Sequence, residues 1–158
     1  MRPRPALGWL EPLAAIREVG RRVRAVAHHM TAASGNADEL AKARELYNRM
    51  KLGPYPEPSG DEFDLFFAIA SEVQWPKTWA GGELDVKTRS LCTVAALIAS
   101  GKPQVHGHIR AALAVGASRQ EIADVITHIA FYAGFPSAAN ALRAAREVFG
   151  EMDGDEDG

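Results

Sequence analysis

The segment DVKTRSLCTVAALIASGKPQVHGHIRAALAVG, residues 85–116, decides the fold class. Asp85 precedes a helical pattern as an N-cap residue, and apolar side chains then recur around most of that helix until Gly101 stops it. Pro103 opens a second helix, which ends at Gly116. A helix that is apolar on most sides has to be buried centrally. The segment therefore predicts a buried helix inside an all-α fold.

The sequence after this segment continues the helical pattern. Ser118 and Glu121 have the spacing of a capping box, which starts a helix that Gly134 closes. Pro136 then opens a last helix that reaches Phe149. Because the connections are short, we expect neighbouring helices to pack largely antiparallel in a compact bundle.

Two helical stretches precede the segment. One runs from Ala37 to Lys51 and ends in the proline-rich loop LGPYPEPSG, residues 52–60. The other follows a capping-box pattern formed by Ser59 and Glu62. It places apolar side chains on one helix face, namely Phe63, Phe66, Phe67 and Ala70.

The two ends of the chain carry opposite charge. The first 24 residues hold six arginines and two glutamates, whereas residues 147–158 hold six acids and no base. We expect residues 1–36 to form an extension that is partly helical or mobile, with a helical stretch near residues 12–29. Residues 37–149 form one helical domain in this interpretation, and residues 150–158 form an acidic disordered tail.

Composition limits the classes of function. The chain has 47% hydrophobic and 24% charged residues, as is usual for a globular domain, and its net charge of -2 argues against a nucleic-acid partner. Cys92 is the only cysteine, so no disulfide forms within one chain. No stretch is long and apolar enough to span a bilayer. We therefore expect a cytoplasmic protein with no membrane partner.

Two histidines lie close together in the segment, but their spacing does not suit a metal. Residues two apart on a helix point in roughly opposite directions, so His106 and His108 cannot grip one ion together, and we expect no metal site. His106 shares a helix face with Arg110, whereas His108 lies on the opposite flank. A half-desolvated His108 suits acid–base work, and the alternative is a histidine at the surface beside the core.

Other side chains suit a ligand pocket, each with a structural alternative. Glu72 continues a row formed by Leu65 and Ile69. If a neighbour covers this row, burial keeps the carboxyl group protonated near neutral pH as a proton donor; if the row is open, Glu72 is a solvated helix end. Trp75 and Trp79 either shield a ligand or bury a connection that contains Pro76.

A second candidate pair lies on the helix after Ser118. His128 and Tyr132 are one turn apart, and they either line a cleft or border the core.

Taken together, a series of spaced motifs resembles the carboxymuconolactone decarboxylase family, in its wider grouping with the AhpD-like alkylhydroperoxidases. The resemblance covers about residues 59–149. It depends on Leu84-Asp85 with Lys87-Thr88-Arg89, on His108-x-Arg110-x-Ala112, on Gly116 followed by residues 118–122, and on His128 with Tyr132-Ala133-Gly134-x-Pro136.

The chain also departs from patterns of that family. Glu72, Trp75 and Trp79 match a Glu-x-x-Trp-Gly-x-x-Trp element, but Pro76 replaces its glycine and Lys77 stands where an acidic residue is common. These changes put the substrate in question. The peroxidase branch would place its two cysteines at residues 101 and 104, which are glycine and glutamine here. A peroxidase that uses Cys92 is the weakest alternative.

The resemblance implies an AhpD-like helical bundle that forms a ring-like homo-oligomer, a trimer or hexamer, with pockets near subunit contacts. It also implies a decarboxylase without a cofactor, acting on a small carboxylated lactone or a related acid. Glu72 or His108 is then the proton donor, and Arg89 is preferred to Arg110 as the carboxylate anchor. The implied pocket wall consists of Trp75, Trp79, His128 and Tyr132. The main alternative is a non-catalytic oligomeric member that binds a small ligand.

Overall fold

The computed structural model describes residues 37–58 and 60–156, and this part of the chain is helical, with no strand. The prediction of an all-α fold is confirmed. In chain order the helices are α2 (Ala37–Arg49), α3 (Asp64–Ala68), the π-helix η1 (Ile69–Trp79), α4 (Val86–Ala99), α5 (Val105–Ala114), α6 (Arg119–Ala133) and α7 (Phe135–Glu156).

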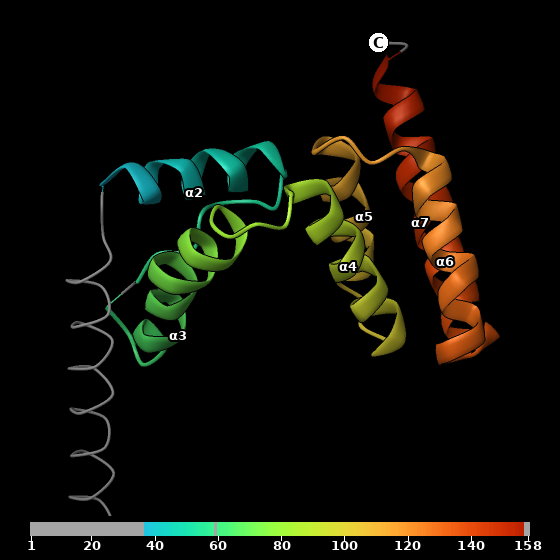
Figure 1. The fold of residues 1–158 in the computed structure, drawn as a ribbon, viewed down its shortest axis with the longest axis horizontal. Helices are drawn as coiled ribbons and strands as arrows, with labels where there is room; N and C mark the ends of the chain where they lie inside the picture. The colour runs from blue at the N-terminus through green and yellow to red at the C-terminus, as the bar shows by residue number, and fades with distance from the viewer. Residues whose placement is uncertain (1–36, 59, 157–158) are drawn as a thin grey trace, which may run out of the picture.

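The helices form two groups (Figure 1). Helices α4 to α7 make a bundle in which α4 contacts α5, α6 and α7. Helix α2 packs on η1, and these two lie with α3 on the other side of α4 and α5 in Figure 1. The four-helix part carries the segment that decides the fold, and the smaller group positions much of the candidate site.

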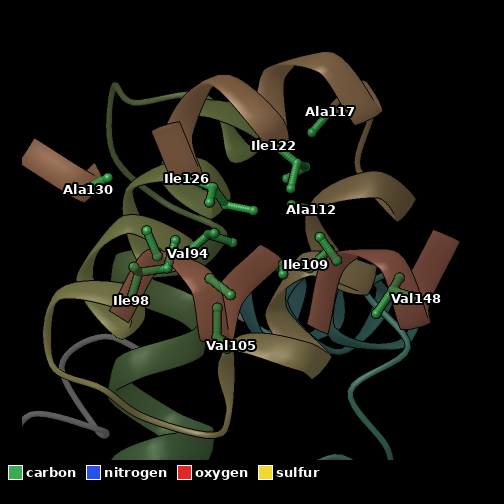
Figure 2. Close-up of a cluster of buried hydrophobic side chains, with 13 residues drawn as sticks. Val94, Ile98, Val105, Ile109, Ala112, Ala117, Ile122, Ile126, Ala130 and Val148 are labelled. Carbon is green, nitrogen blue, oxygen red and sulfur yellow. The ribbon is translucent and has the colours of Figure 1, made fainter. Parts of the chain in front are cut away.

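The main core lies inside the four-helix part, and Figure 2 shows its side chains. Val94 on α4, Ile109 on α5, Ile122 on α6 and Val148 on α7 are fully buried there. Each sits on the inward stripe of an amphipathic helix, so burial of these stripes drives the packing. Helix α4 is central as predicted, but it is not covered on all sides, because Cys92 is exposed.

A second core cluster joins the two groups of helices. It contains Ala43, Leu46 and Met50 from α2 or its end, Trp75 and Trp79 from η1, and Ala111 from α5. Since α5 contributes to both clusters, the π-helix is fixed against the same helix that carries His108.

The sequence signals at the ends of α4 and α6 are confirmed. Asp85 accepts a hydrogen bond from the backbone N–H of Thr88, and Ser118 and Glu121 form the reciprocal capping box. Gly134 ends α6 with a φ of 86°, in the region that favours glycine. Lys87 Nζ lies 2.7 Å from Glu121 Oε1 and links the first turns of α4 and α6.

The start of α3 differs from the prediction. The helix begins at Asp64 with Phe63 in the N-cap position and without a side-chain cap, so Glu62 does not complete a capping box there; Ser59 lies outside the described residues. Asp64 Oδ1 instead accepts from the backbone N–H of Gly60 at 2.6 Å. The phenylalanine face is also largely open, because Phe63 and Phe66 are 60% and 69% exposed.

The acidic end of the chain also differs from the prediction. Helix α7 continues past Phe149 to Glu156, whereas we expected a disordered tail from residue 150. Ion pairs give the physical reason, because Glu151 pairs with Arg110 and Asp153 pairs with Arg119. These pairs offset the repulsion that a run of acids would otherwise produce.

Two expectations concern the chain as a whole. The prediction for residues 1–36 lies outside the described residues. Among the residues that the structure describes, no helix is both long and apolar enough to cross a membrane.

Candidate active site

The candidate site is built around η1, an unusual element. The backbone N–H of Ala80 donates to the carbonyl of Trp75 at 2.9 Å, which is the five-residue spacing of a π-helix. Such helices are rare and occur often at functional sites. We expected Glu72 on an α-helix and the two tryptophans on or beside a connection, so the π-helix was not predicted from the sequence.

Aromatic rings form a stacked column that starts from η1. The rings of Trp75 and Trp79 have centroids 5.1 Å apart and planes 18° apart, and both side chains are buried. Tyr47 of α2 meets Trp75 edge-on at 4.5 Å. On the other side Trp79 faces His108 of α5, with 6.4 Å between ring centroids and 24° between planes. The structure therefore brings three predicted site residues together.

His108 lies in a partly desolvated position at the end of this column. Burial lowers the pKa of its imidazole, because water no longer stabilises the charged form. Its buried Nδ1 has no hydrogen-bond partner among residues 37–58 and 60–156. The ring is therefore neutral at neutral pH, with one nitrogen as a donor and one as an acceptor.

The two histidines of α5 face different surroundings, as predicted. His106 Nε2 lies 3.8 Å from Glu151 Oε1 of α7, and Arg110 pairs with the same glutamate. His106 and Arg110 thus face α7, whereas His108 faces Trp79 of η1. This separation is the reason for preferring Arg89 to Arg110 as the carboxylate anchor.

Arg89 lies beside the loop that follows Trp79. Its Nη2 donates to the carbonyls of Gly81, at 3.1 Å, and Leu84, at 2.8 Å. Its buried Nε has no hydrogen-bond partner within the described part of the chain. The guanidinium group therefore holds the loop in place through one nitrogen and keeps an unused buried donor.

Gly81 has a steric reason to be glycine. A Cβ atom there would lie 3.0 Å from the carbonyl oxygen of Lys77 and 3.1 Å from that of Pro76. These contacts are too tight, and the backbone groups that make them cannot shift as easily as a flexible side chain. The end of η1 and the loop that Arg89 holds are thus packed backbone against backbone.

Glu72 is partly buried and lies near Tyr55. The pKa of Tyr55 is raised mainly by burial, and the negative charge of Glu72 is one of its further causes. The row that Glu72 forms with Leu65 and Ile69 is open within the described part of the chain, since Leu65 and Ile69 are 37% and 47% exposed.

His128 and Tyr132 lie elsewhere on the protomer. Their rings are 4.9 Å apart, and both side chains are exposed. His128 lines a groove of about 360 Å³ between α4 and α6, together with Cys92 and Asp124. No residue of the aromatic column lines this groove. Within the described residues, His128 and Tyr132 are therefore separate from the aromatic column, and the single pocket wall stays a prediction.

The lysine that departs from the family pattern points away from the column. Lys77 Nζ lies 2.5 Å from Glu39 Oε2 of α2, and both side chains are well exposed. The structure therefore places the charge of Lys77 at the surface between η1 and α2. Pro76 is buried inside η1.

Tyr47 and Tyr55 are two residues of this region that sequence reasoning missed. Tyr55 stands in the proline-rich loop, and its hydroxyl donates to the carbonyl of Ser71 at 2.7 Å. An aromatic residue between prolines was a signal, but its partner is 16 residues away. Concerning metals, the described residues contain no group of three or more potential ligands.

The model of the carboxymuconolactone decarboxylase family matches residues 64–147, more than half of the chain. The chain belongs to the carboxymuconolactone decarboxylase family. The resemblance inferred from its motifs is thereby confirmed. The match includes η1, α4, α5 and α6, whereas α2 and Tyr55 precede it.

Two of the curated proteins that are similar to this chain are decarboxylases. The 4-carboxymuconolactone decarboxylase of Acinetobacter baylyi is 35% identical over 88 residues, covering 55% of this chain and 66% of that protein. The nitrosuccinic acid decarboxylase of Metarhizium robertsii is 31% identical over 85 residues, covering 53% and 59%.

A third relative is an uncharacterized 15.0 kDa protein of Paracoccus denitrificans, 38% identical over 85 residues, with 52% and 63% covered. The chain thus spans just under two thirds of the length of the relatives that it matches.

Proposed function

We propose that this member of the family is a carboxy-lyase that needs no cofactor and acts on a small carboxylated lactone or a related acid. Two of its relatives are named as decarboxylases, of 4-carboxymuconolactone and of nitrosuccinic acid. Both named substrates are small carboxylic acids, so the shared demand on the site is to bind a carboxylate and direct its loss.

The reaction breaks the carbon–carbon bond to the carboxylate. Carbon dioxide leaves, and the electron pair of that bond passes into the conjugated carbonyl of the lactone, which gives an enolate. A proton then adds to carbon and completes the product. Because the substrate supplies its own electron sink, the protein has to orient the carboxylate, stabilise the developing charge and return one proton.

The observation that carries this proposal is the stacking of His108 on the buried Trp79, with Arg89 of α4 hydrogen-bonded to the adjoining loop. A neutral imidazole takes up a proton to become an imidazolium, and burial makes that imidazolium a stronger acid, so His108 suits the transfer of a proton to the enolate carbon once it has been protonated. The carboxyl group of Glu72 is the second candidate donor, from the helix that carries both tryptophans. The guanidinium group of Arg89, with a further donor that no described residue uses, is the candidate anchor for the carboxylate.

The proposal includes self-association into a trimer or hexamer. Three aromatic side chains are exposed near the junction of α6 and α7, namely Phe131, Tyr132 and Phe135. Two more are exposed on α3 and its N-cap, namely Phe63 and Phe66. Exposed apolar groups of this size are typical of protein contacts. A neighbouring copy would cover the row beside Glu72 and bring His128 and Tyr132 to the pocket.

The test is a decarboxylation assay with 4-carboxymuconolactone that follows the release of carbon dioxide. We expect turnover by the parent chain and a loss of at least about 100-fold in kcat for His108→Gln and Glu72→Gln, the scale of general acid catalysis. His106→Gln is the matched control, because this histidine faces α7 on the other flank of the same helix. Full activity in both site variants would overturn the assignments.

The alternative is a family member that binds a small acid without converting it. The contacts of Arg89 support this alternative. Its Nη2 already donates to two loop carbonyls, so the guanidinium group has a structural role that does not depend on catalysis. Saturable binding of the lactone by calorimetry, without release of carbon dioxide, would favour the binding protein over the enzyme.

A further inference from the structure

The π-helix contains a proline, and the register of the helix identifies which carbonyl loses its partner. In a π-helix the N–H of each residue bonds to the carbonyl five residues earlier. Pro76 has no N–H, so the carbonyl of Ser71 has no donor from the helix. Ser71 is buried, and a buried carbonyl without a partner is costly.

A side chain from outside the helix meets this carbonyl. The hydroxyl of Tyr55 donates to Ser71 O at 2.7 Å, a normal length for an O–H donor. The Tyr55 ring is itself held in place: Tyr47 meets it edge-on at 5.3 Å, and the guanidinium of Arg44 lies 4.8 Å from its centre. The donor thus reaches the one carbonyl that Pro76 leaves free.

We propose that Tyr55 is a positioning residue, whose hydroxyl replaces the missing backbone donor of Pro76 and holds η1 in its π-helical register. The bond ends at Ser71, directly before Glu72, and the gap that it fills lies directly after Trp75. Glu72 and Trp75, whose positions depend on the helical register, therefore lie next to the two ends of the gap that this bond fills. Burial also raises the pKa of Tyr55, so the hydroxyl keeps its proton and remains a donor.

The catalytic part of this inference rests on the proposed function, whereas the structural part does not. Without the bond, η1 gains freedom to leave the π register. A change of register rotates Trp79 relative to Glu72, and Trp79 is the residue on which His108 stacks. Loss of the hydroxyl would then lower kcat more than it raises KM, because it disturbs the catalytic geometry rather than a substrate contact.

A double-mutant cycle with Tyr55→Phe and Pro76→Ala tests the replacement directly. Alanine restores the N–H that proline lacks. In the parent background we expect Tyr55→Phe to raise the unfolding equilibrium constant about tenfold, since it strands a buried carbonyl. With Pro76→Ala present, we expect the same change to have an effect of about twofold or less.

The matched control is Tyr47→Phe, a neighbour in the same aromatic cluster whose hydroxyl makes a long bond of 3.4 Å to Leu52 O. Its effect should be the same in both backgrounds, because Leu52 is not a partner that Pro76 affects. An equal effect of Tyr55→Phe in both backgrounds, or no effect in either, overturns the replacement.

The positioning role has its own readout, which needs no substrate. Stacked indoles couple through their strong far-ultraviolet transition, so the exciton signal in circular dichroism reports the geometry of Trp75 and Trp79. Tyr55→Phe should change the signal of the folded protein, and Pro76→Ala should restore it. An unchanged signal in the folded Tyr55→Phe variant overturns the positioning role.

The role of Tyr55 can still be tested if the parent chain does not decarboxylate the lactone. In that case the proposed reaction fails, while the unfolding cycle and the dichroism still decide the role of Tyr55. If the parent is active, a drop in kcat for Tyr55→Phe that Pro76→Ala rescues supports the full inference, and an undiminished kcat overturns its catalytic part.

Discussion

The imidazole of His108 lies nearly parallel to the indole of Trp79, with 24° between the planes and 6.4 Å between the centroids. The two residues come from α5 and η1, and their stacking joins the four-helix part of the fold to the π-helix. Burial lowers the pKa of this imidazole, and Trp79 is one of the side chains packed beside it.

Replacing this indole should alter the titration of the histidine. Burial lowers the pKa of His108. We expect Trp79→Leu to move the pKa of His108 back toward its ordinary value, because a smaller side chain admits water. Titration of the imidazole signals by NMR measures this shift, with His106 in the same spectra as the internal control. An unchanged titration of His108 in the variant would mean that Trp79 does not shield it.

The same histidine makes stability depend on pH. The pKa of His108 is lower in the folded chain than its ordinary value of about 6.5 in an unfolded one, so between the two values the unfolded chain binds more protons. The free energy of unfolding should therefore be highest above about pH 6.5 and fall as the pH is lowered through this window. Urea titrations at several pH values measure it, and His108→Gln should flatten the slope just below about pH 6.5.

Two carboxylates should make the free energy of unfolding depend on pH in a more acidic range. The pKa of Glu121 is lowered mainly by its hydrogen bond with Lys87, and that of Asp85 mainly by its bond with the Thr88 side chain. Both contributions should be present at neutral pH and be lost as the pH falls below about 4. Glu121→Gln should reduce this acid-dependent loss in thermal melts, and no change would show that the pair with Lys87 is not maintained in solution.

The capping box of α6 should have a measurable effect. We expect Ser118→Ala to lower the free energy of unfolding by about 0.5–2 kcal/mol, because the first turn loses a side-chain acceptor. Ser118→Gly is the matched comparison and should cost only a few tenths of a kcal/mol. Chemical denaturation gives both values. An unchanged free energy of unfolding in Ser118→Ala would indicate that the hydroxyl is not the capping group.

The main core should respond more strongly than the surface. Ile122 is fully buried between helices, so Ile122→Ala should cost about 2–5 kcal/mol through lost burial and a residual cavity. Thr127→Ala on an exposed turn of the same helix is the control and should stay within about 0.5 kcal/mol. Denaturant midpoints compare the two, and a small effect at Ile122 would place the core elsewhere.

Lys77 stands where an acidic residue is common in the family, and its replacement tests whether this difference affects activity. Its ammonium group faces Glu39 on α2, so Lys77→Gln should leave decarboxylation unchanged within about twofold and alter stability little, as is usual for an exposed pair. Glu39→Gln should behave alike. A large change in KM for Lys77→Gln alone would show that this lysine reaches the substrate.

Local signals in the sequence determined much of the fold. The acceptors at Asp85 and Ser118 and the glycine at 134 act on groups within a few residues, so the boundaries of α4 and α6 could be predicted from them. The motifs around His108 likewise indicated the family, and the helical period placed His108 and Arg110 on different flanks of α5.

Tertiary structure decided the composition of the site. The donor that replaces Pro76 comes from Tyr55, and the ring that shields His108 comes from another helix, so neither partner follows from spacing along one segment. The expected acidic tail became helix for the same reason, because Arg110 and Arg119 from other helices pair with its carboxylates. Capping and amphipathic periodicity are short-range and can be read from sequence, whereas register, shielding and ion pairing depend on which distant residues the packed helices bring into contact.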